Sequence, residues 1–272
     1  MVEIKTREFR ELSDYVYMNF GINLTDKKKI LVMSRLQKVL NSHQFDSFES
    51  YLYNIKKDTS LKLASELIDH ISTNHTYFMR EEMHFKFLED EIIPWIFNNF
   101  KKRKDLRIWS AGCSSGQEPY TLAMVLYKYF ENKGWDKRIL ATDISNRVLS
   151  LAKTGIYPKE QIEELPKGWA KRFFKEKNQF TVEVKPFIRD EVIFRRFNLM
   201  NPVFNFKKPL HVIFCRNVMI YFDKKTINQL VKRYYDALIP GGYLITGQSE
   251  ALNRDEIPFV YIKPSIYRKP LK

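Results

Sequence analysis

The fold of this chain is indicated by the stretch Ile108-Trp109-Ser110-Ala111-Gly112-Cys113-Ser114-Ser115-Gly116-Gln117-Glu118-Pro119-Tyr120. A short apolar run changes into a turn of small residues and then into a segment with the pattern of a helix. Glycine is scarce, with nine in 272 residues, yet Gly112 and Gly116 both lie in this turn. Glycines at a strand-to-helix turn let backbone N–H groups approach a ligand beside the positive end of a helix. The stretch therefore predicts a binding site for a nucleotide-like cofactor.

Strands and helices alternate on the C-terminal side of residue 106. The apolar patterns predict strands at 106–111, 138–142, 191–197, 211–215 and 243–247, and helices at 118–130, 146–153 and 224–238. Pro240-Gly241-Gly242 is typical of a turn before the last strand. Such alternation predicts an α/β fold with a doubly wound, mostly parallel sheet. A period-two pattern at 179–184 predicts a small antiparallel insertion near 173–190.

The first 71 residues have apolar side chains at helical spacing and predict a small N-terminal helical domain. We expect a linker and a helix over 72–105, and a cofactor-binding domain over 106–272. Thr25 precedes the second predicted helix and is a candidate cap. This helix has a basic face that is either a solvated surface or a docking surface, formed by Lys27, Lys28, Lys29, Arg35 and Lys38.

Composition narrows the class of protein. The chain is 44% hydrophobic and 15% aromatic, which is typical of a folded globular protein. It has no apolar run long enough to span a membrane, and Met1 to Phe9 lacks the apolar core of a signal peptide. Two cysteines without metal-ligand spacing predict a reducing, cytoplasmic location and no metal site. The net charge of +14 is either a solvated surface or an attraction to an acidic partner.

Polar residues follow the predicted parallel strands where these end. Asp143, Asn198 and Arg216 come directly after three of them. Ligands bind outside the carboxyl ends of such strands, and Asp143 could accept hydrogen bonds from both hydroxyls of a ribose. The turn is G-x-x-x-G rather than G-x-G-x-x-G, and Asp143 comes later than the acidic residue of a dinucleotide site. The spacing therefore favours S-adenosylmethionine over NAD.

Four motifs give the chain a family resemblance. They are the segment Ser72–Glu81, the turn that begins at Ala111, Ala141–Ile144 and Phe214–Asp223. Together they closely resemble the CheR-type chemotaxis receptor methyltransferases. The motifs occur in the family order and the resemblance covers essentially the whole chain.

The resemblance implies a Rossmann-like methyltransferase that moves a methyl group from S-adenosylmethionine to glutamate side chains of chemoreceptors, leaving S-adenosylhomocysteine. This reaction serves adaptation in chemotaxis. By the family pattern, Tyr221 and Arg216 are the catalytic candidates. The cofactor-binding candidates are Asn74, Thr76, Arg80, Gly112, Glu118, Asp143, Asn198, Leu199, Arg216 and Asn217.

Other interpretations of the same residues stay open at this point. The chain could be a nucleic-acid methyltransferase, although Cys215–Val218 stands where such enzymes usually have Asn/Asp-Pro-Pro-Tyr/Phe. It could also bind S-adenosylmethionine as a signalling adaptor without turnover. Cys113 could be an activated thiolate near a helix start, and Tyr221 could simply close the top of a strand.

The receptor is the expected partner, without nucleic acid or membrane insertion. Family members that tether to a receptor's C-terminal peptide have a glycine-rich turn in the inserted sheet, whereas Lys175–Gln179 has no glycine. We therefore expect recognition of receptor helices through the basic helix at 27–38, without that tether. A monomer would be sufficient for the chemistry.

Overall fold

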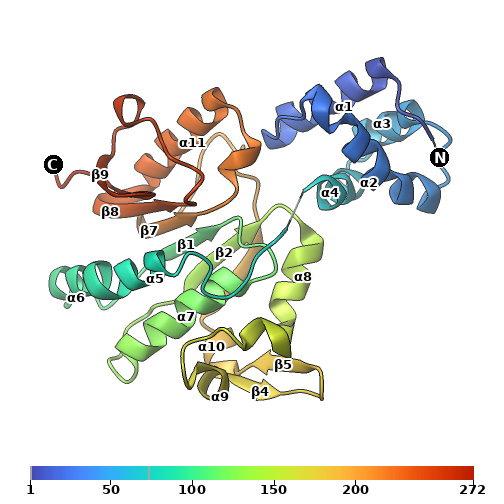
Figure 1. Ribbon diagram of the computed structural model, residues 1–272. Helices are drawn as coiled ribbons and strands as arrows, with labels where there is room; N and C mark the ends of the chain where they lie inside the picture. Colours follow the sequence, from blue (N-terminus) through green and yellow to red (C-terminus); the bar gives the residue numbers. More distant parts are fainter. Residues whose placement is uncertain (1, 73) are drawn as a thin grey trace.

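A seven-stranded sheet forms the centre of the computed structural model, which describes residues 2–72 and 74–272 (Figure 1). Its strands are β1 (Ile108–Ala111), β2 (Ile139–Asp143), β6 (Val192–Arg196), β7 (Leu210–Cys215), β8 (Leu238–Thr246), β9 (Val260–Lys263) and β10 (Ile266–Arg268). Their order is β6-β2-β1-β7-β8-β10-β9, and the first five are mutually parallel. The predicted mostly parallel sheet is confirmed. The antiparallel strands β9 and β10 were not predicted.

Helices cover both faces of this sheet. Residues of β7 alternate between two apolar cores: Phe214 packs on one face, and Ile213 and Cys215 on the other. The first face is covered by α5 (Met83–Phe87), a π-helical turn (Leu88–Ile92), α6 (Ile93–Phe100) and α7 (Gln117–Phe130). The second is covered by α11 (Lys224–Ala237). The helix α8 (Asn146–Thr154) follows β2. The sheet is therefore doubly wound, as predicted.

The predicted turn at Pro240-Gly241-Gly242 is wrong, because β8 runs through these residues without interruption. The pairing of β8 with β7 shifts its register between Leu210 and Val212, and Gly241 has φ of +78°. A glycine with positive φ inside a strand is typical of a bulge. Proline and glycine occur both in turns and in β-bulges. The sequence pattern therefore could not distinguish a turn from a bulge at this position.

The insertion is a small antiparallel sheet of order β3-β5-β4. It consists of β3 (Ile156–Pro158), β4 (Phe174–Glu176) and β5 (Thr181–Val184), and it is accompanied by α9 (Trp169–Phe173) and α10 (Pro186–Arg189). The antiparallel insertion is confirmed, but it starts earlier than predicted since β3 precedes residue 173. Three residues of strand give too short a pattern to be read from sequence.

The N-terminal helices are α1 (Thr6–Phe20), α2 (Lys29–Ser42), α3 (Phe48–Lys57) and α4 (Lys62–Ile71), and they share an apolar core of their own. A 3-10 turn, Asp26–Lys28, leads into α2. The Thr25 side chain makes no capping hydrogen bond with the described residues, so the predicted cap is wrong. The predicted boundaries after residues 71 and 105 stay a prediction. Within the described ranges, no helix is both long and apolar enough to cross a bilayer.

The end of α1 meets the α/β part of the chain at the carboxyl edge of the sheet. The Tyr17 hydroxyl donates to Asp223 Oδ2 at 2.8 Å, and the Asn198 amide donates to the backbone oxygen of Asn19 at 2.7 Å. The Asn23 N–H donates to the backbone oxygen of Tyr221 at 2.8 Å. The helical domain therefore stands beside the edge at which parallel strands present their ligand sites.

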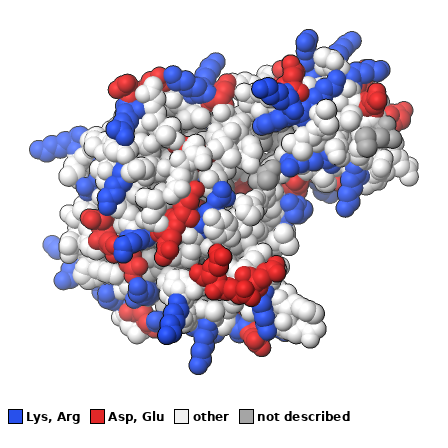
Figure 2. All heavy atoms as spheres, in the orientation of Figure 1, with Lys and Arg blue, Asp and Glu red and all other residues white. Residues whose placement is uncertain are grey.

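Figure 2 shows basic side chains spread over the visible face with acidic ones among them.

Candidate functional site

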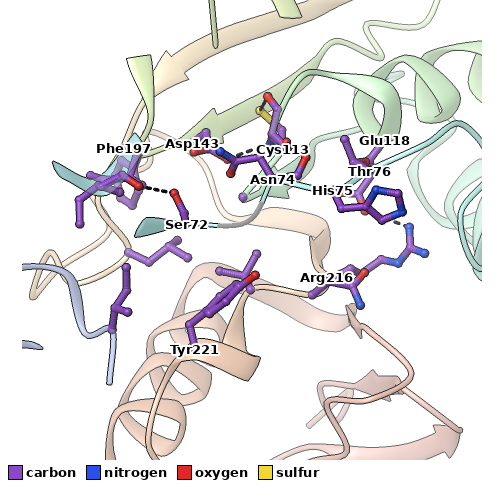
Figure 3. Close-up of a pocket in the computed structure, with 18 of the residues that line it drawn as sticks. Ser72, Asn74, His75, Thr76, Cys113, Glu118, Asp143, Phe197, Arg216 and Tyr221 are labelled. Atoms are coloured by element: carbon purple, nitrogen blue, oxygen red, sulfur yellow. Dashed lines mark hydrogen bonds and ion pairs between the residues drawn. The ribbon is translucent and has the colours of Figure 1, made fainter. Parts of the chain in front are cut away.

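A pocket lies at the carboxyl edge of the parallel strands. The helical domain contributes Phe20, Ile22 and Ile68 to its wall. Every site residue predicted from the sequence lines this pocket: Asn74, Thr76, Arg80, Gly112, Glu118, Asp143, Asn198, Leu199, Arg216, Asn217 and Tyr221. Figure 3 shows Tyr221 across the pocket from Asn74 and Asp143.

The turn after β1 has room only for glycine at its first position. Gly112 has φ of +88°, and its N–H donates to the backbone oxygen of Thr142 at 2.8 Å. A Cβ at this position would lie 2.3 Å from Cγ2 of Val218, which also lines the pocket. The close approach of these two segments is what shapes this wall of the pocket.

We therefore expect Gly112→Ala to weaken binding of S-adenosylmethionine by a factor of roughly ten, because relieving the overlap must displace the turn or Val218, both of which line the pocket. The matched control is Gly134→Ala, where φ is +65° but an added Cβ meets no described atom within 4 Å. Calorimetric titration of both variants measures the effect. Equal affinities in the two would contradict a close-packed turn.

Asp143 holds this turn from the end of β2. Its Oδ2 accepts from the Ser114 N–H at 2.8 Å and its Oδ1 from the Ser145 N–H at 3.0 Å. Burial raises the pKa of this carboxyl, against the lowering effect of the backbone hydrogen bonds. Each carboxylate oxygen has a second lone pair, so both can also accept from ligand hydroxyls.

Arg216 lies between two carboxylates of the chain itself. Its Nη1 is 2.9 Å from Glu118 Oε2 and its Nη2 is 3.2 Å from Glu81 Oε2. Nη2 also donates to the backbone oxygen of Arg80, and the side chain is only 2% exposed. Glu118 accepts a further hydrogen bond from the Ser110 hydroxyl at 2.7 Å. The guanidinium is thus compensated within the protein before any ligand binds.

Two buried donors of pocket-lining residues have no hydrogen-bond partner among the described residues. They are Nδ2 of Asn74 and Nε of Arg216. Buried donors are nearly always satisfied in folded proteins, so a ligand with acceptor atoms fits here. S-adenosylmethionine has a carboxylate and ring nitrogens to accept these bonds, and it has hydroxyl and ammonium groups for Asp143 and Glu118. The residues present therefore fit this cofactor.

The Cys113 thiol beside the pocket is not an activated nucleophile. Cys113 lines the pocket, but burial raises the pKa of its thiol well above its usual range, which contradicts an activated thiolate. His75 lines the pocket and is exposed. No group of three or more potential metal ligands occurs in the part of the chain that the structure describes.

Two family models match almost the entire chain. The model described as "CheR methyltransferase, all-alpha domain" matches residues 7–72, and "CheR methyltransferase, SAM binding domain" matches residues 74–267. The chain belongs to the CheR methyltransferase family. A chemotaxis protein methyltransferase of Borreliella burgdorferi is 43% identical, with 98% of this chain and 96% of the relative covered. The chemotaxis protein methyltransferase Cher2 of Pseudomonas putida is 36% identical, with coverages of 95% and 96%.

The chain is therefore an S-adenosylmethionine-dependent methyltransferase. Both domains that the CheR family models describe are represented in it. The resemblance stated from the sequence motifs is confirmed.

Sequence reasoning missed two acidic residues behind the pocket wall. Glu250 is buried and accepts from the N–H groups of Asn217 and Gly247 at 2.7 Å and of Ile220 at 3.1 Å. It thereby holds the loop that follows β7. Glu81 binds Arg216, as described above. The motif Ser72–Glu81 contained the signal for Glu81, but nothing local in the sequence identifies the partners of either carboxylate.

Proposed function

We propose that this methyltransferase transfers methyl groups to glutamate side-chain carboxylates of chemoreceptors, giving glutamyl methyl esters and S-adenosylhomocysteine. The observation that carries the proposal is the gathering of all the motif residues around one pocket in a chain whose relatives are named chemotaxis protein methyltransferases.

Each lining residue then has a proposed role. Glu118 serves the methionine end of the cofactor and Asp143 its ribose. Asn74, Thr76 and Arg80 reach the cofactor from the linker. The adenine and methyl-transfer region is lined by Asn198, Leu199, Arg216 and Asn217.

The acceptor requires little chemical activation. A glutamate side chain has a pKa near 4.3, so at neutral pH it is already a nucleophile and needs no general base. When bound, S-adenosylmethionine supplies a methyl group on a cationic sulfur, and the electron pair of the broken C–S bond stays on that sulfur. The residues of the chain have to align the carboxylate and exclude water. Tyr221 lines the pocket, and we propose that its ring lies close to the sulfonium or the incoming carboxylate.

A transfer assay with tritiated S-adenosylmethionine tests this proposal. Receptor membranes and RNA are offered side by side, and base-labile counts on the receptor identify a carboxyl ester. Arg80→Ala and Asp143→Ala should remove most of these counts. Base-stable counts on RNA would favour a nucleic-acid methyltransferase, and cofactor binding without any counts would favour an adaptor.

Receptor helices are the proposed partner of one face of the helical domain. Side chains at 27, 30, 31, 34 and 38 follow helical spacing and all are exposed. Ile30 is 75% exposed and Leu31 45%, with Lys27 and Lys38 at the two ends of the stripe. Arg35 is not part of this stripe, since its guanidinium donates to the backbone oxygen of Ile71 at 2.9 Å. An apolar stripe between cations fits a helix with acidic side chains.

Reversing the charge at both ends of this stripe, in Lys27→Glu/Lys38→Glu, is expected to raise the KM for the receptor by roughly tenfold, because each reversal replaces an attraction by a repulsion. The affinity for S-adenosylmethionine should not change. Lys102→Glu/Lys207→Glu, with the same change in net charge at exposed positions that do not line the pocket, is the control. An unchanged KM in the first variant would remove this face as the docking surface.

We also propose recognition without a C-terminal tether, a cytoplasmic location and a monomeric enzyme. The absence of glycine between Lys175 and Gln179 supports the first, and a monomer would be sufficient for the chemistry. Calorimetry with a receptor C-terminal peptide tests the tether. Micromolar affinity would contradict our proposal.

A further inference from the structure

The linker segment that carries Asn74, Thr76 and Arg80 has no regular secondary structure, so its position depends on side-chain contacts. The Ser114 hydroxyl donates to the backbone oxygen of Asn74 at 3.2 Å, and the Met79 N–H donates to Thr121 Oγ1 at 3.3 Å. The Arg216 guanidinium also donates to the backbone oxygen of Arg80 in this segment. The linker is therefore held against the pocket by individual contacts to the loops around it.

Glu81 adds a charged group with several partners at the end of the segment. Its carboxylate forms the ion pair with Arg216 at 3.2 Å and accepts from the Gln248 N–H at 3.2 Å. It also accepts from Nδ2 of Asn217 at 3.4 Å and lies 3.3 Å from Nδ1 of His84. One side chain, 11% exposed, therefore fastens the linker to the loops after β7 and β8.

The backbone around Arg80 is held in a conformation that needs external support. Met79 has φ of +59° and Glu81 φ of +56°, both in the left-handed region that side-chain-bearing residues seldom adopt. Residues in such backbone conformations are stable only where contacts with the surrounding structure fix them, and they cluster at functional sites. The contacts of Glu81 fix this backbone conformation at the C-terminal end of the segment.

Glu81 itself does not line the pocket, whereas its partners Arg216 and Asn217 do. We infer that Glu81 is a positioning residue: it sets Arg216 between two carboxylates and fixes the linker, and through these it shapes the cofactor site. This inference rests on the proposed function only for the identity of the methyl acceptor, since cofactor binding is measured separately.

Glu81→Gln tests the inference with almost no change in shape. The amide keeps one acceptor oxygen, but its NH2 group then faces either the Asn217 donor or the Arg216 and Gln248 donors, and the negative charge is lost. We expect the dissociation constant for S-adenosylmethionine, measured by calorimetry without receptor, to rise by about tenfold or more, because a charge-assisted hydrogen bond is lost. The KM for receptor should stay within about twofold at saturating cofactor.

Glu82→Gln is the matched control, since the neighbouring carboxylate is exposed and has no side-chain partner within residues 2–72 and 74–272. Glu81→Asp restores the charge and should recover part of the affinity. Melting temperatures of all three variants show whether the fold is kept.

Wild-type affinity in a folded Glu81→Gln variant would overturn the inference. Weakened affinity in Glu82→Gln as well would also overturn it, because a general effect of lost charge would then explain both. If the wild type binds the cofactor but never methylates receptors, the proposed acceptor fails while the binding comparison still decides the role of Glu81.

Discussion

Replacement of Arg216 by methionine is expected to lower the affinity for S-adenosylmethionine by a factor of about 100 or more and to reduce methyl transfer accordingly. The guanidinium stands between Glu81 and Glu118, and its side chain is 2% exposed. Removing one member of a buried ion network destabilises the fold by about 3–5 kcal/mol, since the remaining charges lose their compensation. Because Arg216 and Glu118 both line the pocket, we expect the same loss of order to weaken cofactor binding. A tenfold change in affinity corresponds to about 1.4 kcal/mol.

The loss has two components that different variants separate. Arg216→Lys keeps the positive charge but lacks the planar fork that binds two carboxylates at once. Compared with Arg216→Met, we expect Arg216→Lys to recover more of the free energy of unfolding than of the cofactor affinity. The lysine supplies the charge, but the backbone oxygen of Arg80 and one of the two carboxylates still lose their partner, so the pocket wall is not fully restored. Equilibrium unfolding and calorimetric titration, done on both variants, give the two quantities independently.

Arg147→Met is the control for removal of a cation, as Arg147 is exposed on α8. It should bind the cofactor like the wild type. If Arg216→Met bound S-adenosylmethionine within about threefold of this control, the Arg216 network would have no part in holding the cofactor site.

The parts of the site that sequence could predict are those whose chemistry is local. The turn from Gly112 to Gly116 combines an apolar strand, small residues and a helix within a few positions, so its function can be inferred without the fold. Asp143 follows from the rule that parallel strands present ligands at their carboxyl ends. Both line the pocket.

The parts that sequence could not predict depend on distant partners. Glu81 binds Asn217 and Gln248, which lie 136 and 167 residues away along the chain. Phe20 and Ile22 reach the pocket wall only because α1 docks on the loops after β6 and β7. No periodicity or spacing encodes such contacts, and an acidic residue or a phenylalanine in isolation has many structural uses.

A second large effect is expected in the pH dependence of stability. Burial lowers the pKa of His84 to about 4, with a further contribution from Arg216, and burial together with Arg107 lowers that of His211 to about 4. The ordinary value is 6.5. The unfolded chain therefore binds a proton at each histidine below pH 6.5, whereas the folded chain stays unprotonated down to about pH 4. The contribution of these two histidines to the free energy of unfolding is fully present above pH 6.5. Below pH 6.5 the free energy of unfolding decreases by about 1.4 kcal/mol per pH unit for each histidine.

His211 also shows why protonation is unfavourable in the folded state. Its Nδ1 accepts a hydrogen bond from the Arg107 N–H at 3.0 Å, which a protonated ring cannot do. His211→Asn keeps an acceptor near this position that does not titrate, so the unfolding free energy should fall less steeply between pH 6.5 and 4.5 than in the wild type. Asp143 and Glu250 oppose the trend, since burial raises the pKa of each, but they are common to both proteins and cancel in the difference.

Urea unfolding at half-unit pH intervals measures these slopes, and His43→Asn, at an exposed position on the helical domain, is the control. Ring proton shifts of His84 and His211 followed by NMR provide a second readout that does not depend on folding of a variant. Titration of either ring near pH 6.5 in the folded protein would contradict the prediction, because the charged imidazolium would then be tolerated beside Arg216 or Arg107.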